Sequence, residues 1–555
     1  MIMPLKVYCV NLGREIEAEG GETLYHLLQR IKGEIPFAPI CARVNNKTES
    51  LHYPLYGPKR VEYIDSATQS GQRVYVRSMC MMLYRAVCAV APGARLRIMH
   101  SIAKGYYCKL EGVEITQALI DSLKEHMRRL AVEDMPFERH ERPTEDVIEI
   151  FRSQGLDDKV RLLETLHELY TVYYTLDGVA DSYNSALAPS TGSIRVFELE
   201  IYKKGFLLLG PDPVNLDVPQ QRVTQEKMYE AFTNYLDFNH IIGVRNAGEL
   251  NRNAEEGRSS MLINVAEALH EKKIAVISDD IKRRYDRGGA RVVLISGPSS
   301  SGKTTFTKRL AIQLMTNLLE PTMISLDDYF VNRELTPRDE SGDFDYESLY
   351  ALDLMKFNED LNRLINGEEI ELPTYNFELG QRQYTGRKIK LSGKSVLLIE
   401  GIHGLNPELT ASVASKMKYR VYVSALTTIA IDDHNWVPTT DNRLLRRIIR
   451  DHKYRGASPI ETIRRWPSVR RGEEMWIFPY QENADVTFNS SLIFELSVMR
   501  DQAERALKTV PQDVPEYAEA YRLRRFLHFF APISPDFIPP TSLLREFMGG
   551  SSFHY

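Results

Sequence analysis

Cysteine is scarce in this sequence, and the cysteines present are not spaced for metal or disulfide chemistry. There are five, an odd number without a C-x-x-C pair: Cys9, Cys41, Cys80, Cys88 and Cys108. This spacing argues against a zinc site and against a disulfide framework, and it favours reduced thiols in the cytosol.

Long apolar runs and an excess of positive charge are also missing. No stretch approaches about 18 consecutive apolar residues, the length of a membrane-spanning helix, and residues 1–20 lack the apolar core of a signal peptide. The net charge of −5 argues against binding nucleic acid by bulk electrostatics, although a local basic patch is compatible with it. We therefore expect a cytoplasmic protein that makes no membrane contact.

The most informative stretch runs from Gly297 to Thr305 and matches G-x-x-x-x-G-K-[ST]. An apolar run at 291–296 predicts a buried strand before it, and the pattern at 306–315 predicts a helix after it. Backbone N–H groups of such a loop cradle the phosphates of a nucleoside triphosphate, the lysine adds a charge and the following hydroxyl binds Mg²⁺. The expected cofactor-binding residues are Gly297, Pro298, Ser299, Ser300, Ser301, Gly302, Lys303, Thr304 and Thr305, with Thr304 also a metal ligand.

A parallel sheet is expected around this loop. Strand-like runs alternate with helix-like runs at 292–296, 322–326, 395–400, 419–424 and 485–489. This alternation predicts a doubly wound α/β fold, in which ligands bind beyond the carboxyl ends of the strands.

Acidic residues end two of these runs. Asp327 follows the second run, where a carboxylate can accept the proton of an attacking hydroxyl, and its neighbour Asp328 is the alternative. Glu400 ends the third run, where Mg²⁺ is held directly or through water. Either acid alone could equally close a turn; the phosphate loop makes the functional interpretation the better one.

Several short motifs follow the phosphate loop in a fixed order. They are S-L-D-D-Y-F at 325–330, F-D at 344–345, P-T-Y-N-F at 373–377 and E-G-I at 400–402. Over residues 290–495 the sequence thereby resembles the uridine kinase and phosphoribulokinase family. The resemblance implies that Asp327 is the base for a sugar 5′-hydroxyl, that Asp345 binds ribose hydroxyls, and that Tyr375 and Phe377 line or stack on the nucleobase.

Two positions depart from that pattern. Uridine kinases carry a histidine soon after the Tyr-x-Phe element, where this sequence has Gly380, and their S-x-D motif often ends in tyrosine where this one has Phe330. Loss of a side chain that donates a hydrogen bond to the nucleobase relaxes or redirects the selectivity for pyrimidines. The residues of phosphoryl transfer are unaffected.

An arginine-rich segment lies beyond the fourth run. Arg443, Arg446, Arg447 and Arg450 have the i, i+3, i+4 and i+7 spacing of one helix face, which in isolation would be a solvated basic face. In the family, arginines at this place close over the triphosphate. The pattern favours Arg443 and Arg446 as catalytic residues, ahead of Arg450 and Arg455; His403, just after Glu400, is better explained as structural.

The front half carries a different resemblance. Residues 1–64 resemble the β-grasp TGS domain, and residues 65–215 resemble the α+β editing domain of threonyl-tRNA synthetase, best matched at Pro189–Gly192. The four positions that carry histidine or cysteine in that family are not zinc ligands here, so we expect no hydrolytic chemistry: they are Arg77, Met81, Tyr183 and Leu187.

The remaining segments complete the expected organisation. Residues 216–285 form a helical connector, 286–500 the kinase-like domain and 501–555 a packing extension. The favoured hypothesis is a Mg²⁺-dependent nucleoside kinase that uses ATP or GTP and forms a homo-oligomer. The alternatives are a kinase for another small hydroxyl compound, such as a sugar or sugar phosphate, and an RNA-associated regulator that contacts RNA through its front half and uses the nucleotide site as a switch.

Overall fold

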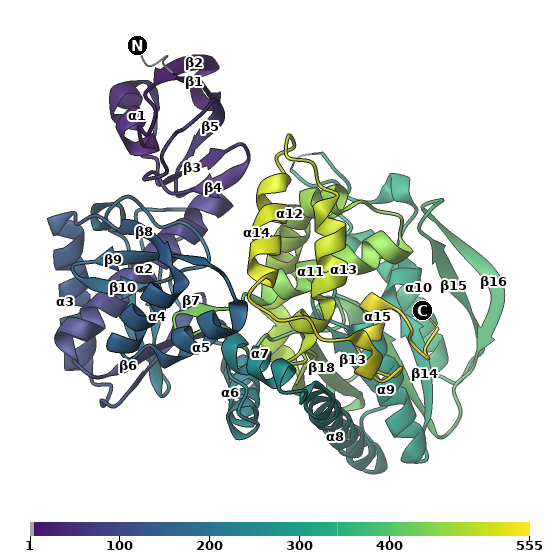
Figure 1. Cartoon of the computed structure of the whole chain (residues 1–555). Helices are drawn as coiled ribbons and strands as arrows, with labels where there is room; N and C mark the ends of the chain where they lie inside the picture. The colour runs from purple at the N-terminus through teal and green to yellow at the C-terminus, as the bar shows by residue number, and fades with distance from the viewer. Residues whose placement is uncertain (1–4, 341, 555) are drawn as a thin grey trace.

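A computed structural model describes residues 5–340 and 342–554. The chain runs from two front units, through a helical connection, into a back half that is built on a parallel sheet (Figure 1).

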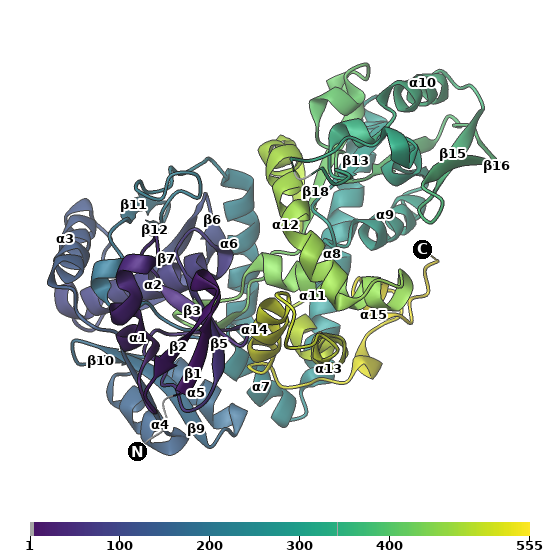
Figure 2. The ribbon, with the colours of Figure 1, turned by 90° about the horizontal axis from the view of Figure 1, so that it is seen from above.

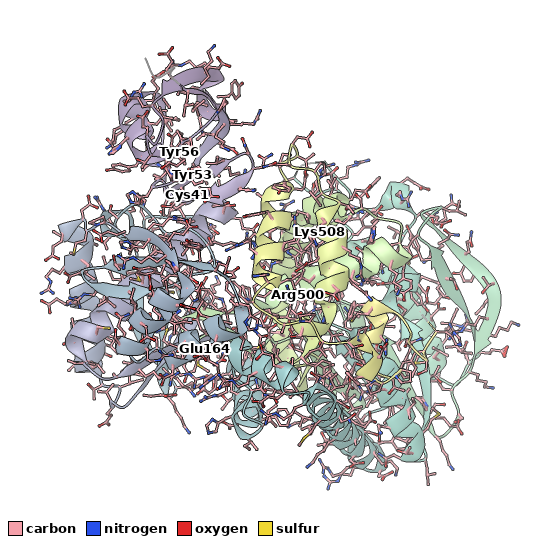
Figure 3. The ribbon with its side chains drawn as sticks, in the orientation of Figure 1. Cys41, Tyr53, Tyr56, Glu164, Arg500 and Lys508 are labelled. Carbon is pink, nitrogen blue, oxygen red and sulfur yellow. The ribbon has the colours of Figure 1, made fainter. Side chains whose placement is uncertain are left out.

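The first unit is a mixed sheet with a helix across it. Its sheet order is β2-β1-β5-β3-β4, and β1 and β5 are parallel. Thr23 starts the helix because its hydroxyl accepts the backbone N–H of His26, and the helix buries one apolar face on the sheet. In Figure 3, Cys41 and Tyr53 mark this unit. Its elements are β1 (Leu5–Cys9), β2 (Arg14–Ala18), α1 (Leu24–Ile31), β3 (Cys41–Val44), β4 (Lys47–Glu49) and β5 (Lys59–Ile64).

The second unit packs helices on two small antiparallel sheets, ordered β11-β12-β7-β6 and β10-β9-β8. The long helix α2 is buried along most of its length in the core of this unit. The elements are α2 (Gln69–Val90), β6 (Arg95–Ile102), β7 (Gly105–Glu111), α3 (Gln117–Glu133), β8 (Glu138–Pro143), α4 (Thr144–Ser153), α5 (Asp157–Leu166), β9 (Tyr170–Leu176), β10 (Val179–Asp181), β11 (Glu198–Tyr202) and β12 (Gly205–Leu209).

Three helices connect the halves: α6 (Glu226–Ile241), α7 (Ala247–Glu255) and α8 (Ser259–Asp286). The sequence predicts loop or cap structure at 251–260, but residues 251–255 are helical. Asn246 caps α7, and the Asn251 side chain bonds Thr165 and the Phe529 carbonyl, so tertiary contacts hold this polar segment in a helix. Glu164, labelled in Figure 3, pairs with Arg252 where α5 meets α7.

The back half contains the expected parallel sheet, in the order β14-β17-β13-β18-β21. All five predicted strands belong to it, and apolar clusters cover both faces. The strands are β13 (Val292–Ser296), β14 (Glu320–Ser325), β17 (Ser395–Glu400), β18 (Lys418–Ser424) and β21 (Val486–Asn489), with hairpins β15 (Ile370–Asn376)–β16 (Gln381–Ile389) and β19 (Ala430–Asp432)–β20 (Asn435–Trp436). The helices are α9 (Lys303–Thr316), α10 (Leu354–Ile365), α11 (Thr439–Tyr454), α12 (Pro459–Trp476), α13 (Glu495–Lys508), α14 (Tyr517–Leu527) and α15 (Arg545–Met548).

The β19–β20 hairpin ties the back half to the second unit. The Ile98 N–H donates to the Asp433 carbonyl at 2.7 Å. Lys159, fully buried, lies 2.9 Å from both Asp181 of the second unit and Asp432 of the hairpin. Breaking a buried ion pair is strongly destabilising because it leaves an uncompensated charge in the interior. The ion pairs of Lys159 therefore hold the two halves together.

Within residues 5–340 and 342–554, every helix is too short or too polar to span a bilayer.

His100 belongs to β6 of the second unit, and its imidazole stacks on Phe232 of α6 with ring centroids 3.6 Å apart. Burial lowers the pKa of His100 from 6.5 to about 3. A folded-state pKa below the unfolded one gives stability that is complete above pH 6.5 and is lost as pH falls toward 3. We expect this group to remove about 3 kcal/mol from the free energy of unfolding between pH 7 and pH 4. Denaturant titrations of His100→Phe should therefore show a flatter acid slope, whereas the exposed control His452→Gln should match the parent chain.

Candidate active site

The phosphate loop has the predicted strand–loop–helix frame. It leaves β13 after Ser296, and α9 begins at Lys303. Gly302 caps α9 with a φ of 84°, a left-handed conformation that glycine adopts without strain. A Cβ at Gly297 would lie 1.9 Å from the Val423 carbonyl of the neighbouring strand, so only glycine fits. The N-terminus of α9 directs its partial positive charge into this loop.

Glu400 reaches the loop from the end of the adjacent strand β17. The Thr304 hydroxyl donates to Glu400 Oε1 at 2.9 Å, while Glu400 Oε2 is buried without a hydrogen-bond partner among the described residues. Burial raises the pKa of Glu400 to about 7, despite the nearby charge of Lys303. A hydroxyl and an unsatisfied carboxylate oxygen beside a phosphate loop fit Mg²⁺, which takes oxygen ligands. Thr304 and Glu400 would hold it.

The two neighbouring aspartates at the end of β14 have different surroundings. Asp328 is half-buried, and its Oδ1 accepts the Tyr375 N–H at 3.3 Å, which fixes the β15 strand. Asp327 is exposed, and no described residue hydrogen-bonds its carboxylate. Its charge contributes to raising the pKa of both Glu347 and Glu400. It follows Ser325, the β14 residue that pairs with Glu400 on β17. Asp327 therefore has the open carboxylate of the two, whereas Asp328 is engaged with β15.

Aromatic side chains gather beyond Asp327. The Tyr375 ring lies 5.5 Å from Phe330 and 5.1 Å from Phe377, and these three rings form one group. Tyr375 is buried, whereas Phe377 is 57% exposed and can cover a ligand. Asp345 accepts the Glu347 N–H at 3.1 Å, and burial raises its pKa.

Arg333 occupies the region where the family pattern has a histidine. Its backbone N–H donates to the Gly380 carbonyl at 2.8 Å, and its guanidinium donates to the Phe377 carbonyl at 2.6 Å. A Cβ at Gly380 would lie 2.7 Å from the Arg333 side chain, so the glycine makes room for the arginine. Arg333 lies between the S-L-D-D-Y-F and F-D motifs and belongs to neither, so the sequence pattern gives no indication of its position.

Arg443 and Arg446, the two arginines favoured by the sequence, are buried beneath the phosphate loop. Arg443 pairs with Glu473 and donates to the Ser299 carbonyl at 3.1 Å. Arg446 pairs with Glu495 at 2.5 Å and donates to the Ser490 carbonyl at 2.9 Å. Their exposed fractions are 1% and 0%, so these guanidinium groups support the loop from the protein side.

Three other arginines of the same segment, Arg447, Arg450 and Arg455, are less buried. Arg447 donates to Ser299 Oγ at 2.8 Å. Arg450 lies close enough to Arg455 that their repulsion, together with burial, lowers the pKa of Arg455 to about 10. Arg455 also senses the charge of Asp327. All three pair with one carboxylate, that of Asp451, at 3.3, 2.8 and 3.7 Å, so three cations share a single anion, and an anionic ligand would offset the remaining positive charge. The sequence pattern did not favour Arg447, although this residue contacts the loop. Its i+4 spacing from Arg443 indicates that the two lie on the same helix face.

Four positions of the second unit correspond, by the resemblance, to the histidines and cysteine of the synthetase editing domain, and their side chains lie in its interior. Met81 and Leu187 are fully buried apolar side chains, and Arg77 and Tyr183 are each 9% exposed. Burial lowers the pKa of Arg77 to about 10. The described residues contain no cluster of His, Cys, Asp and Glu that could hold a metal ion.

Comparison with known proteins agrees with this geometry. Residues 292–493 match the model of the Phosphoribulokinase / Uridine kinase family. The match covers the phosphate loop and all five strands of the parallel sheet. A uridine kinase of Staphylococcus aureus (strain JH9) is 29% identical over 196 residues, which are 35% of this chain and 85% of that protein.

The front half of the chain is similar to another group of proteins. A threonine–tRNA ligase of Desulforamulus reducens is 28% identical over 181 residues, 32% of this chain, and that of Rubrobacter xylanophilus is 25% identical over 189. The chain spans only 28% and 29% of those ligases.

A solved structure described as a possible uridine kinase from Bacillus stearothermophilus is 20% identical, with a TM-score of 0.25. The match covers 36% of this chain and 89% of the chain in that structure. The similarity to the kinase family and the similarity to the ligases occur in one polypeptide.

Proposed function

We propose that the protein is a Mg²⁺-dependent nucleoside kinase that transfers the γ-phosphoryl group of ATP or GTP to a nucleoside 5′-hydroxyl. The observation that carries this proposal is the exposed Asp327 carboxylate. It follows β14, whose last residue Ser325 pairs with Glu400, and Glu400 accepts the hydroxyl of Thr304 from the phosphate loop. The phosphate loop follows β13 and the base follows β14, on either side of β17, so the donor and the acceptor would meet at the carboxyl ends of these parallel strands.

The phosphate loop binds and orients the donor. Its backbone N–H groups and the α9 N-terminus hold the phosphates, and Lys303 supplies positive charge at the β/γ end. Bound Mg²⁺, held by Thr304 and Glu400, would offset charge on the transferred phosphoryl group. Because the barrier in phosphoryl transfer depends chiefly on position and charge, these groups supply most of the acceleration.

The acceptor lies on the side of Asp327. Asp327 takes the proton of the attacking hydroxyl, and Asp345 holds ribose hydroxyls. Tyr375 and Phe377 stack on the base. With Arg333 in place of a histidine beside Phe377, a guanidinium with several donors replaces one imidazole, and base selectivity should differ from that of uridine kinases.

We further propose that Arg447, Arg450 and Arg455 contact the triphosphate, while Arg443 and Arg446 act through the loop that they support. Their surroundings motivate this assignment: Arg443 and Arg446 each pair with a buried glutamate, whereas Arg447, Arg450 and Arg455 share the single carboxylate of Asp451.

Arg455→Ala and Arg443→Ala should fail in different ways. The Arg455 side chain is 56% exposed. Its replacement should lower kcat/KM about 10²-fold and leave the melting temperature unchanged. Arg443→Ala leaves Glu473 buried with less compensation and should reduce the free energy of unfolding by about 3–5 kcal/mol. Thermal unfolding and steady-state kinetics measure both, with exposed Arg505→Ala as the matched control. Loss of stability in Arg455→Ala, with no kinetic defect, would contradict the assignment.

A panel of acceptors tests the proposed reaction. Phosphate transfer from ATP and from GTP is measured on pyrimidine and purine nucleosides, sugars and sugar phosphates, with Mg²⁺ or with chelator. We expect turnover of a nucleoside that stops when Mg²⁺ is removed. Turnover confined to sugars or sugar phosphates would instead support the alternative kinase.

A second candidate function comes from the ligase-like front half. Its similarity to threonine–tRNA ligases favours contact with RNA, and the kinase domain would then act as a nucleotide-dependent switch. tRNA binding whose affinity falls steeply with salt supports this candidate. Rapid nucleoside turnover without any tRNA binding removes it.

A further inference from the structure

The C-terminal tail returns to the phosphate loop. After α14 the chain runs back along the kinase domain, and both views place α15 near α9 and α11 (Figures 1 and 2). Leu543 and Phe547 are fully buried in the apolar cluster on one face of the parallel sheet. Lys453 of α11 donates to the Met548 carbonyl at 2.5 Å. The tail is therefore docked on the kinase domain by its own apolar contacts.

One side chain of this tail contacts the nucleotide-binding residues directly. Glu546 Oε2 accepts the Thr305 hydroxyl at 2.6 Å and the Thr305 backbone N–H at 3.2 Å. Thr305 is in the first turn of α9, where N–H groups have no partner within the helix and the helix dipole favours an anion. The carboxylate thus takes the hydrogen bonds that a phosphate bound in this loop would use.

The backbone of the loop is covered as well. A Cβ at Gly302 would lie 2.3 Å from Leu543 Cδ2, so the Leu543 side chain packs directly on the last glycine of the loop. An additional fixed carboxylate beside a site for a polyanion opposes binding of that polyanion.

We propose that the tail, through Glu546, is an intramolecular competitor of the nucleotide. The carboxylate and a phosphate group need the same N–H and hydroxyl of Thr305, so the two are mutually exclusive there. The docked tail is the closed form, and the nucleotide binds after Glu546 has left Thr305. This inference rests on the proposed nucleotide-binding function.

The tail also has a route by which the front half can bias it. Glu519 of α14 pairs with Arg73 of α2 at 2.6 Å and with Arg522 at 2.6 Å. Arg522 in turn pairs with Asp441 at the start of α11, at 2.7 Å. These ion pairs connect α2 of the front half, through α14, to α11, the helix whose Lys453 holds the tail.

Glu546→Ala tests the competition. We expect the Kd for ATP with Mg²⁺, measured by calorimetry on the full chain, to fall about tenfold, because a competing interaction is lost. Glu546→Gln, which removes the charge but keeps an acceptor, should show a smaller decrease. Asp536→Asn, an exposed carboxylate of the same tail that bonds only Ser534 among the described residues, is the matched control and should leave Kd unchanged.

Hydrogen exchange on the parent chain gives a second readout that needs no variant. Saturating ATP with Mg²⁺ should increase exchange in residues 542–549, because the nucleotide displaces the tail. The competition would be overturned if Glu546→Ala bound ATP no more tightly than the parent chain, or if the tail stayed protected from exchange at saturating ATP. Nucleotide binding itself would then still be established. Absence of ATP binding in the parent chain and in every variant would overturn the proposed function together with it.

Discussion

Lys303→Ala should abolish phosphate transfer, lowering kcat/KM by about 10³-fold or more. The ammonium group is the only lysine charge within the phosphate-loop motif, and it lies at the start of α9, with Nζ 3.3 Å from the Pro298 carbonyl. In the transition state negative charge spreads over the transferred phosphoryl oxygens, and a fixed cation there stabilises that state more than the ground state.

Binding of ATP with Mg²⁺ should weaken in the same variant, so calorimetry and steady-state kinetics together measure the effect. Lys282→Ala, which removes a partly exposed lysine of α8 that pairs with Asp286, is the control and should behave like the parent chain. Near-normal turnover in Lys303→Ala would remove the phosphate loop from the mechanism.

Asp327→Asn should separate chemistry from binding. The amide is isosteric with the carboxylate but cannot accept the proton of the attacking hydroxyl, so we expect kcat to fall by about 10²–10⁴-fold. Asp327 hydrogen-bonds no described residue through its carboxylate, so folding and ATP affinity should be retained. The kcat is measured at saturating acceptor, and the Kd for ATP is measured separately.

The neighbouring aspartate provides the matched control. Asp328→Asn keeps an oxygen that can accept the Tyr375 N–H, so its effect on kcat should stay below about tenfold. If Asp328→Asn were the severely impaired variant and Asp327→Asn the mild one, the base would be Asp328, the alternative that the sequence leaves open.

Much of the kinase domain follows from local pattern. Strand β13, the glycines and α9 can be predicted because the strand's apolar run, the loop motif and the helical period are contiguous in the sequence. Asp327 and Glu400 can be placed at one edge because parallel strands end on the same side of a sheet. Ordered motifs therefore define most of the site.

The arginines show where local pattern stops being sufficient. Spacing puts Arg443, Arg446, Arg447 and Arg450 on one broad face, yet it cannot say which of them meets a buried carboxylate. Glu473 and Glu495 come from later helices, and their burial decides that Arg443 and Arg446 are held inside. Electrostatic partners that are distant in sequence determine the roles here.

By itself, the sequence determined a phosphate loop, the strand ends that surround it and a front half of ligase-like character, because each depends on residues that are neighbours along the chain. Only the tertiary structure decided that the β19–β20 hairpin joins the halves and that Glu546 returns to Thr305 across 241 positions. Contacts of that separation follow from packing of the buried Leu543 and Phe547 and from charge burial, and no local period or motif encodes them.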